Sequence, residues 1–199
     1  MQPSVERSRH FGQALSQSLT GTLVPDLRPA LLSLVSYDVA MEHHGSIVEL
    51  VAAQRVASAL ALMRPMFESL VTGLWATYVA SESDIEIYNQ GRGKRDILAT
   101  LHRLRKKDDG EFIEILIAQY QKHELAMHSY THGGVYQVAR RIGPTHIGPQ
   151  YEPDEVEDLL QFADSVLSAV AIEAVSLFSN LSLEEKVHEL IFERFPRRA

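Results

Sequence analysis

Cysteine is absent from the 199 residues of the chain. The chain can therefore form no disulfide, no thiolate nucleophile and no zinc site with cysteine ligands. An early apolar run is missing too, because the polar residues 1–10 lead into no hydrophobic segment, so we expect no secretory signal. Both absences are typical of a cytoplasmic protein, and that is the localisation we expect.

Long hydrophobic runs are also scarce. The most apolar window, Ser165–Leu181, is interrupted by Glu173 and is shorter than the roughly 20 residues that a membrane-spanning helix needs. We interpret this window as a buried helix and expect no membrane partner. Positive charge is in short supply as well, with 19 lysine and arginine residues against 26 acidic ones and a formal net charge of −7. This balance argues against broad binding to DNA and leaves room only for a local basic patch.

Strand-like alternation of apolar and polar residues is absent from any segment of length, whereas helical spacing recurs along the chain. The expected fold class is all-α, a helical bundle with two long hairpin arms. We expect a single domain over residues 1–199. It divides into an N-terminal helix within 1–24, a bundle core over 25–181 and a short C-terminal helix within 182–199.

The first arm is predicted to follow a break at residues 43–45 and to begin at Ser46, which forms a capping-box pattern with Glu49. Apolar residues then recur every three or four positions, and Pro65 inside them should kink or split the helix near Met63. The stripe consists of Val56, Leu60, Met63, Phe67, Leu70, Leu74 and Tyr78. The second arm is the helix predicted over residues 151–181, after which Ser182 and Glu185 form another capping-box pattern.

Arg64 and Glu68 lie one helical turn apart at the margin of this stripe, on the same side as Trp75. They either form a partly buried ion pair inside the bundle or line a pocket that binds a ligand. A second group of charges lies in residues 92–107, where seven arginine or lysine residues stand against one acid, Asp96. On a helical wheel Ile97, Leu98, Leu101 and Leu104 share one face, while Arg95, His102, Arg103 and Lys106 fall largely on the other. That basic face is either simply solvated or a patch for an anionic partner.

Residues 122–134 hold the densest group of proton-transferring side chains. His128 and His132 are four apart and share a helix face, with Tyr130 between them and Gly133 directly after. A metal could use both histidines with Glu124, or with Glu42, His43 or His44 from another helix, but no clear carboxylate motif completes such a site. We therefore expect no metal and no cofactor. Metal-independent RNA cleavage would instead use the histidines for proton transfer and an arginine to hold the phosphate.

The segments Met127–Gly134 and Leu62–Glu68 resemble a group of bacterial helical proteins similar to the HEPN (higher eukaryote and prokaryote nucleotide-binding) superfamily, whose members include toxins and abortive-infection ribonucleases. The resemblance covers roughly residues 40–180 and implies a helical, dimeric protein. Active members carry an arginine followed, after four to six positions, by a histidine. His132 matches that histidine, but Met127 stands where the arginine belongs, and a proline interrupts the alternative pair of Arg140 or Arg141 with His146.

The resemblance therefore supports a HEPN-like module, expected as a homodimer, that binds a nucleotide, RNA or a protein partner without clear catalysis. The alternative is a metal-independent ribonuclease of a defence or toxin type, using His132 and His128 with a cation from Arg64 or from residues 92–107. A metal-dependent bundle enzyme is the second alternative. The dimer surface is expected on the apolar stripe of the first arm or on the C-terminal helix.

Overall fold

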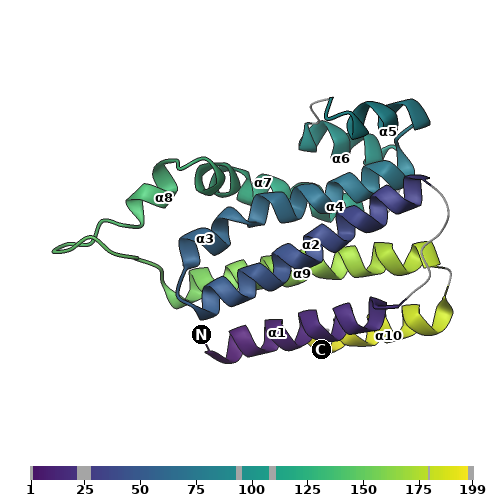
Figure 1. Ribbon diagram of the computed structural model, residues 1–199. Helices are drawn as coiled ribbons and strands as arrows, with labels where there is room; N and C mark the ends of the chain where they lie inside the picture. The colour runs from purple at the N-terminus through teal and green to yellow at the C-terminus, as the bar shows by residue number, and fades with distance from the viewer. Residues whose placement is uncertain (1, 22–27, 93–95, 108–110, 179, 197–199) are drawn as a thin grey trace.

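The computed structural model describes residues 2–21, 28–92, 96–107, 111–178 and 180–196, and these residues form helices and no strands (Figure 1). The fold-class prediction of an all-α protein is therefore confirmed. The helices are α1 (Gln2–Leu19), α2 (Arg28–Ala52), α3 (Val56–Ala61), α4 (Met63–Tyr78), α5 (Glu82–Asn89), α6 (Ile97–Arg105), α7 (Glu111–Thr131), α8 (Val135–Ala139), α9 (Pro153–Phe178) and α10 (Leu181–Arg194).

The helix α9 lies at the centre of the bundle, in contact with α1, α2, α4 and α10. It is apolar nearly all round, and by length and composition it could cross a membrane, but 78% of its most apolar window is buried inside the protein. Leu160, Ala163 and Val170 along it are fully buried. The expectation of a buried helix in this part of the chain is confirmed.

The helices α2 and α4 form the most extensive pair in the bundle. Their close approach depends on Gly73, because a Cβ atom there would lie 2.1 Å from the Tyr37 ring. The predicted break at residues 43–45 is wrong, since α2 continues through Ser46 to Ala52. Apolar residues on both sides of the break keep the core-facing pattern, and this burial outweighs the roughly 1 kcal/mol that a helical glycine costs.

The turn after α2 contains Gln54, whose φ of 60° lies in the left-handed region. The next break falls at Leu62, between α3 and α4, which places Pro65 in the first turn of α4. The prediction that the helix would split near Met63 is therefore confirmed. The stripe residues Phe67 and Leu70 are fully buried, so this part of the stripe is core and not the dimer surface that the sequence suggested.

Two helices begin directly after a short polar capping residue. Ser81 is the N-cap of α5 and forms a capping box with Asp84. The last helix begins after Asn180, whose side chain accepts a hydrogen bond from the Leu183 amide, so the capping box predicted at Ser182 is wrong. In both cases the short polar side chain that comes first can already satisfy the free amides of the first turn.

Candidate functional site

The end of α7 presents two histidines to solvent. The helix stops at Gly133, whose φ of 67° favours glycine, and the Gly134 amide donates a 2.6 Å hydrogen bond to the Ser129 carbonyl. His128 and His132 lie on the exposed side of this last turn. Their ring centroids are 4.7 Å apart.

Arg64 on α4 contacts His128 although it lies 64 residues before it in the chain. Its Nη1 atom lies 3.0 Å from Nδ1 of His128, and its Nε atom donates a 2.8 Å hydrogen bond to Glu68. An arginine can only donate, so Nδ1 of His128 must accept, and its proton then resides on Nε2. The structure therefore brings together Arg64, His128 and His132, with Glu68 orienting the guanidinium.

This cluster of Arg64, His128 and His132 is accessible. The Arg64 side chain is 27% exposed, and both histidines are classed as exposed. Thr131 links the end of α7 to α3 through a weak hydrogen bond of 3.4 Å to the Ala61 carbonyl. An open surface of this kind suits a large ligand better than a small enclosed molecule, which would need a concave pocket.

The neighbouring residues of α7 face inward. Met127, at the position where active HEPN nucleases carry arginine, is 1% exposed and packs in the core. Tyr130 is also buried and lies apart from the two exposed histidines, in a cavity of about 160 Å³ that is lined also by Tyr136, Tyr151, Arg140 and Glu155. Burial raises the pKa of the Tyr130 hydroxyl well above its usual range, which makes it unsuited to proton transfer near neutral pH.

Trp75 is not part of the cluster. It lies eleven residues beyond Arg64 on α4, is 5% exposed, and packs edge to face against Tyr88 of α5 with the ring centroids 5.9 Å apart. Trp75 of α4 and Ile85 of α5 belong to the same small apolar cluster, which attaches α5 to the bundle. Of the ligand-binding residues predicted on α4, only Glu68 therefore touches Arg64.

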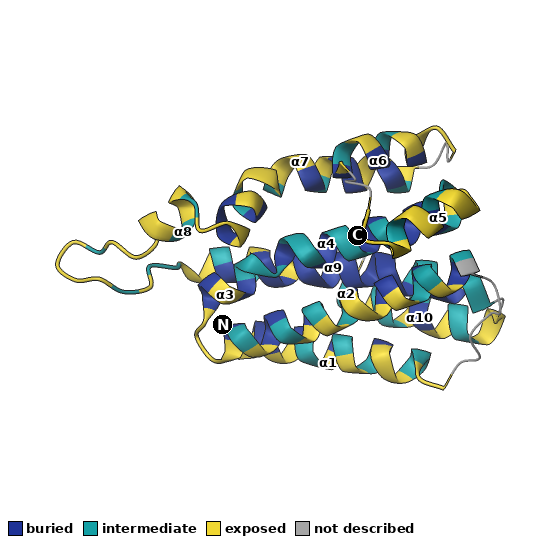
Figure 2. Ribbon diagram, turned by 45° about the horizontal axis from the view of Figure 1, so that its top comes forward, coloured by how far each residue is buried: buried dark blue, intermediate teal, exposed yellow. Residues whose placement is uncertain are grey.

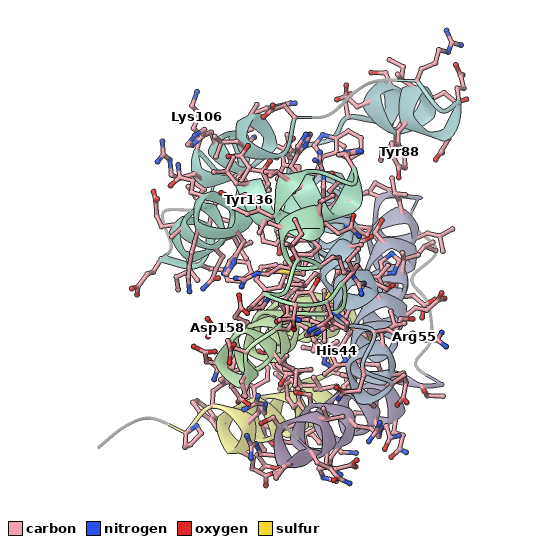
Figure 3. The ribbon with its side chains drawn as sticks, turned by 90° about the vertical axis from the view of Figure 1, so that its left-hand side faces the viewer. His44, Arg55, Tyr88, Lys106, Tyr136 and Asp158 are labelled. Atoms are coloured by element: carbon pink, nitrogen blue, oxygen red, sulfur yellow. The ribbon has the colours of Figure 1, made fainter. Side chains whose placement is uncertain are left out.

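The C-terminal end of the predicted basic patch lies far from the cluster. Arg103 on α6 and Lys106 directly after it are exposed, and His102 is half-buried, while Arg95 lies outside the described residues. Phe112, near the start of α7, lines a pocket together with Lys107 at the end of α6. From Phe112 to His128 is 16 residues, or about 24 Å of helix, so the end of the patch next to Lys107 is too far away to supply the cation for the histidines. Figure 3 shows Lys106 at the outer edge of the molecule.

Among the described residues, no group of three or more histidine, aspartate or glutamate side chains could hold a metal ion. His44, named as a possible ligand, is instead buried at 2% exposure and bonded to Asp164, with its Nε2 atom 2.7 Å from Oδ1. Figure 3 places His44 among the central helices.

Asp164 is the centre of a buried polar network that the sequence reasoning missed. It is fully buried on α9, and its Oδ2 atom accepts hydrogen bonds from Ser8 at 2.8 Å and from Arg194 at 2.7 Å. With His44 these residues join α1, α2, α9 and α10 at one point. Asp164 is the only carboxylate within residues 159–172, and this was the available signal, because such a group must find partners when it is buried.

The His44 ring fits closely beneath α1. A Cβ atom at Gly12 would lie 2.6 Å from its Cε1 atom, so the contact needs glycine at this position. Beside it a surface hollow of about 490 Å³ lies between α1 and α2, lined among others by Gln13, Glu42 and Glu49. Glu49 is paired there with Arg9, whose hydrogen bond lowers the pKa of the Glu49 carboxyl.

The chain belongs to a family of unknown function, DUF6988, whose model matches residues 37–197. This range includes the whole Arg64–His128–His132 cluster. It also includes His44, Asp164 and Arg194 of the buried network, while Ser8 precedes it. No curated protein and no solved structure matches the chain.

Proposed function

We propose that this member of a family of unknown function binds the phosphodiester backbone of RNA at the cluster of Arg64, His128 and His132. The observation that carries the proposal is the 3.0 Å contact between Nη1 of Arg64 and Nδ1 of His128, beside a second imidazole. A guanidinium is the preferred side chain for phosphate because it donates two parallel, charge-assisted hydrogen bonds. A protonated histidine beside it adds a second cation and a further donor.

The resemblance to HEPN proteins is consistent with this site, except that the arginine comes from a different helix. Active HEPN nucleases carry the arginine on the same helix as the histidine, at the position where this chain has the buried Met127. Arg64 supplies a guanidinium from α4 at the same surface. The phosphate-holding group and the proton-transferring groups are therefore near each other, although the α7 sequence alone separates them.

Binding is tested with a fluorescently labelled single-stranded RNA of about 12 nucleotides, measured by fluorescence anisotropy at low salt. Arg64→Ala should weaken binding by about 10- to 100-fold, because a hydrogen bond to a charged group contributes about 1.5–3 kcal/mol. Arg103→Ala removes an exposed arginine on the distant α6 and serves as the matched control. Equal affinity in the wild type and Arg64→Ala would contradict the proposal.

A second candidate function is metal-independent cleavage of RNA, and the 4.7 Å separation of the two imidazole rings favours it. One neutral histidine would take the proton of the ribose 2′-hydroxyl as its oxygen attacks the phosphorus. The other, protonated, would donate to the departing 5′-oxygen, leaving a 2′,3′-cyclic phosphate and a 5′-hydroxyl. Arg64 would hold the charge of the phosphate during this transfer.

Cleavage is measured on the same RNA in the presence of EDTA, with the products separated by gel. The double variant His128→Ala/His132→Ala should lose cleavage, whereas each single variant should retain part of the binding. Binding without any turnover in the wild type would reject the ribonuclease and leave the binding module. Undiminished cleavage by the double variant would show that another site, or a contaminant, is responsible.

A further inference from the structure

Residues 135–150, named here the apolar arm, project beyond the end of the bundle (Figure 1). The arm consists of α8 and a hairpin closed by a bridge between Ile142 and Ile147. Backbone hydrogen bonds order it, from Gly148 to the Arg141 carbonyl at 3.0 Å and from Gln150 to the Arg140 carbonyl at 2.9 Å. The arm therefore has a defined shape that a partner could recognise.

Large apolar side chains of the arm face solvent. Ile147 is 89% exposed and Ile142 is 70% exposed, and Val135, Tyr136 and Val138 of α8 are exposed as well. Figure 2 shows the arm exposed along nearly its whole length. A cluster of exposed aliphatic side chains of this kind marks a surface for protein contact, because leaving it in water is unfavourable.

The net charge of the apolar arm indicates which kind of protein surface would bind it. Residues 135–150 contain Arg140 and Arg141 and no acid, so their formal charge is +2. The rest of the chain, 199 minus 16 or 183 residues, then carries −7 minus +2, which is −9. Arg140 already pairs with Glu155 of its own chain, whereas Arg141 is exposed. A partner with an acidic, apolar surface is required, and another copy of this chain has one.

The complementary surface lies on α2. Leu31, Val35 and Val39 recur at four-residue spacing and are 48%, 52% and 39% exposed, forming what is named here the α2 stripe. Asp38 and Glu42 are exposed and lie three residues after Val35 and Val39, on the same side of the helix. The stripe therefore offers apolar contacts flanked by two carboxylates, which match the isoleucines and the exposed arginine of the arm.

We propose that the apolar arm of one copy docks on the α2 stripe of a second copy, and that the contact is reciprocal. Each chain carries both surfaces, so a two-fold axis uses both twice and closes the assembly as a dimer. A stable interface buries about 1,200–2,000 Å² in total, and a reciprocal contact doubles the area that one arm and one stripe bury. RNA is the poorer occupant, since aliphatic side chains make no contact with phosphate. This proposal does not depend on RNA binding by the Arg64 cluster.

Sedimentation equilibrium of the full chain tests the dimer. The wild type should dimerise, and Ile142→Ser/Ile147→Ser should raise the dimer Kd by at least about 100-fold, because two large exposed side chains lose their apolar contact. Val35→Ser should weaken the same dimer from the other surface. Leu181→Ser is the matched control, since Leu181 is 77% exposed on α10 and belongs to neither surface. Circular dichroism verifies that each variant folds.

The absence of cysteine allows a second, site-specific measurement. Ile147→Cys and Val35→Cys chains, purified separately and mixed under mild oxidation, should form a mixed disulfide within minutes. Ile147→Cys mixed with Phe192→Cys should not, although Phe192 is 52% exposed on α10.

Three results would overturn the proposal. The first is a wild type that stays monomeric at about 100 µM. The second is a dimer that Ile142→Ser/Ile147→Ser leaves intact, which places the interface elsewhere. The third is equal cross-linking to both cysteine partners. If the arm variant loses RNA affinity while its oligomeric state is unchanged, the arm is an RNA contact and the dimer surface proposed here is wrong.

Discussion

At the scale of single residues, Asp164 is a buried carboxylate that depends on several polar partners. It is fully buried; its Oδ2 atom accepts hydrogen bonds from Ser8 and Arg194, and its Oδ1 atom contacts Nε2 of His44. Burying charges costs several kcal/mol per ion, and the mutual attraction compensates only when the geometry is good. The network therefore acts as a specific junction between the terminal helices and the core.

Replacing Asp164 by asparagine should destabilise the protein by about 3–5 kcal/mol, because it leaves the guanidinium of Arg194 partly buried without its counter-charge. The free energy of unfolding is measured by urea denaturation followed by circular dichroism. Asp158→Asn changes an exposed aspartate of the same helix and should alter stability by no more than about 0.5 kcal/mol. Equal effects of the two substitutions would show that the network contributes nothing specific.

Part of the cluster of Arg64, His128 and His132 could be predicted from the sequence. The spacing of His128 and His132 fixed their common face, and the chemistry of both side chains indicated proton transfer. The spacing of Arg64 and Glu68 indicated their ion pair, which the structure contains. The sequence had no means to choose between Arg64 and residues 92–107 as the cation, because that choice depends on how α4 crosses α7.

At the scale of elements, the end of α7 positions the cluster. Gly133 takes a φ of 67°, and the His132 amide still donates to the His128 carbonyl at 3.1 Å. Glycine suits this position because it adopts the left-handed conformation without steric cost. The continuous α2 was not predictable in the same way, since a histidine pair and a glycine look like a stop signal until the burial of the flanking residues is known.

Gly133→Ala should lower stability by about 1 kcal/mol, because a side chain in the left-handed region meets the following carbonyl. The last turn of α7 should fray, and the His132 amide should exchange with deuterium faster than in the wild type. Gly133→Asn is the control, since asparagine tolerates this conformation better than other residues with a side chain. The same exchange rate in the alanine and asparagine variants would contradict the role of backbone conformation here.

At the scale of the whole molecule, periodicity was enough to predict an all-helical bundle and the burial of its most apolar segment. It could not predict which helices meet, because the spacing of apolar residues gives a face and not a partner. The convergence of four helices on Asp164 and the projection of the apolar arm both arise from tertiary packing. Both involve residues that look ordinary in the sequence.

The stability of the whole molecule should also depend on pH through His123, which packs on Phe162 of α9 with the ring centroids 5.1 Å apart. Burial, and secondarily the Lys122 charge, lower the pKa of His123 below its ordinary value of about 6.5. The unfolded chain then binds a proton that the folded chain resists, so stability falls as pH drops below about 6.5. His123→Gln should reduce the loss of unfolding free energy between pH 7.5 and 5.5, whereas His10→Gln, at an exposed position, should not. Identical pH profiles for the wild type and His123→Gln would show that carboxylates alone cause the acid sensitivity.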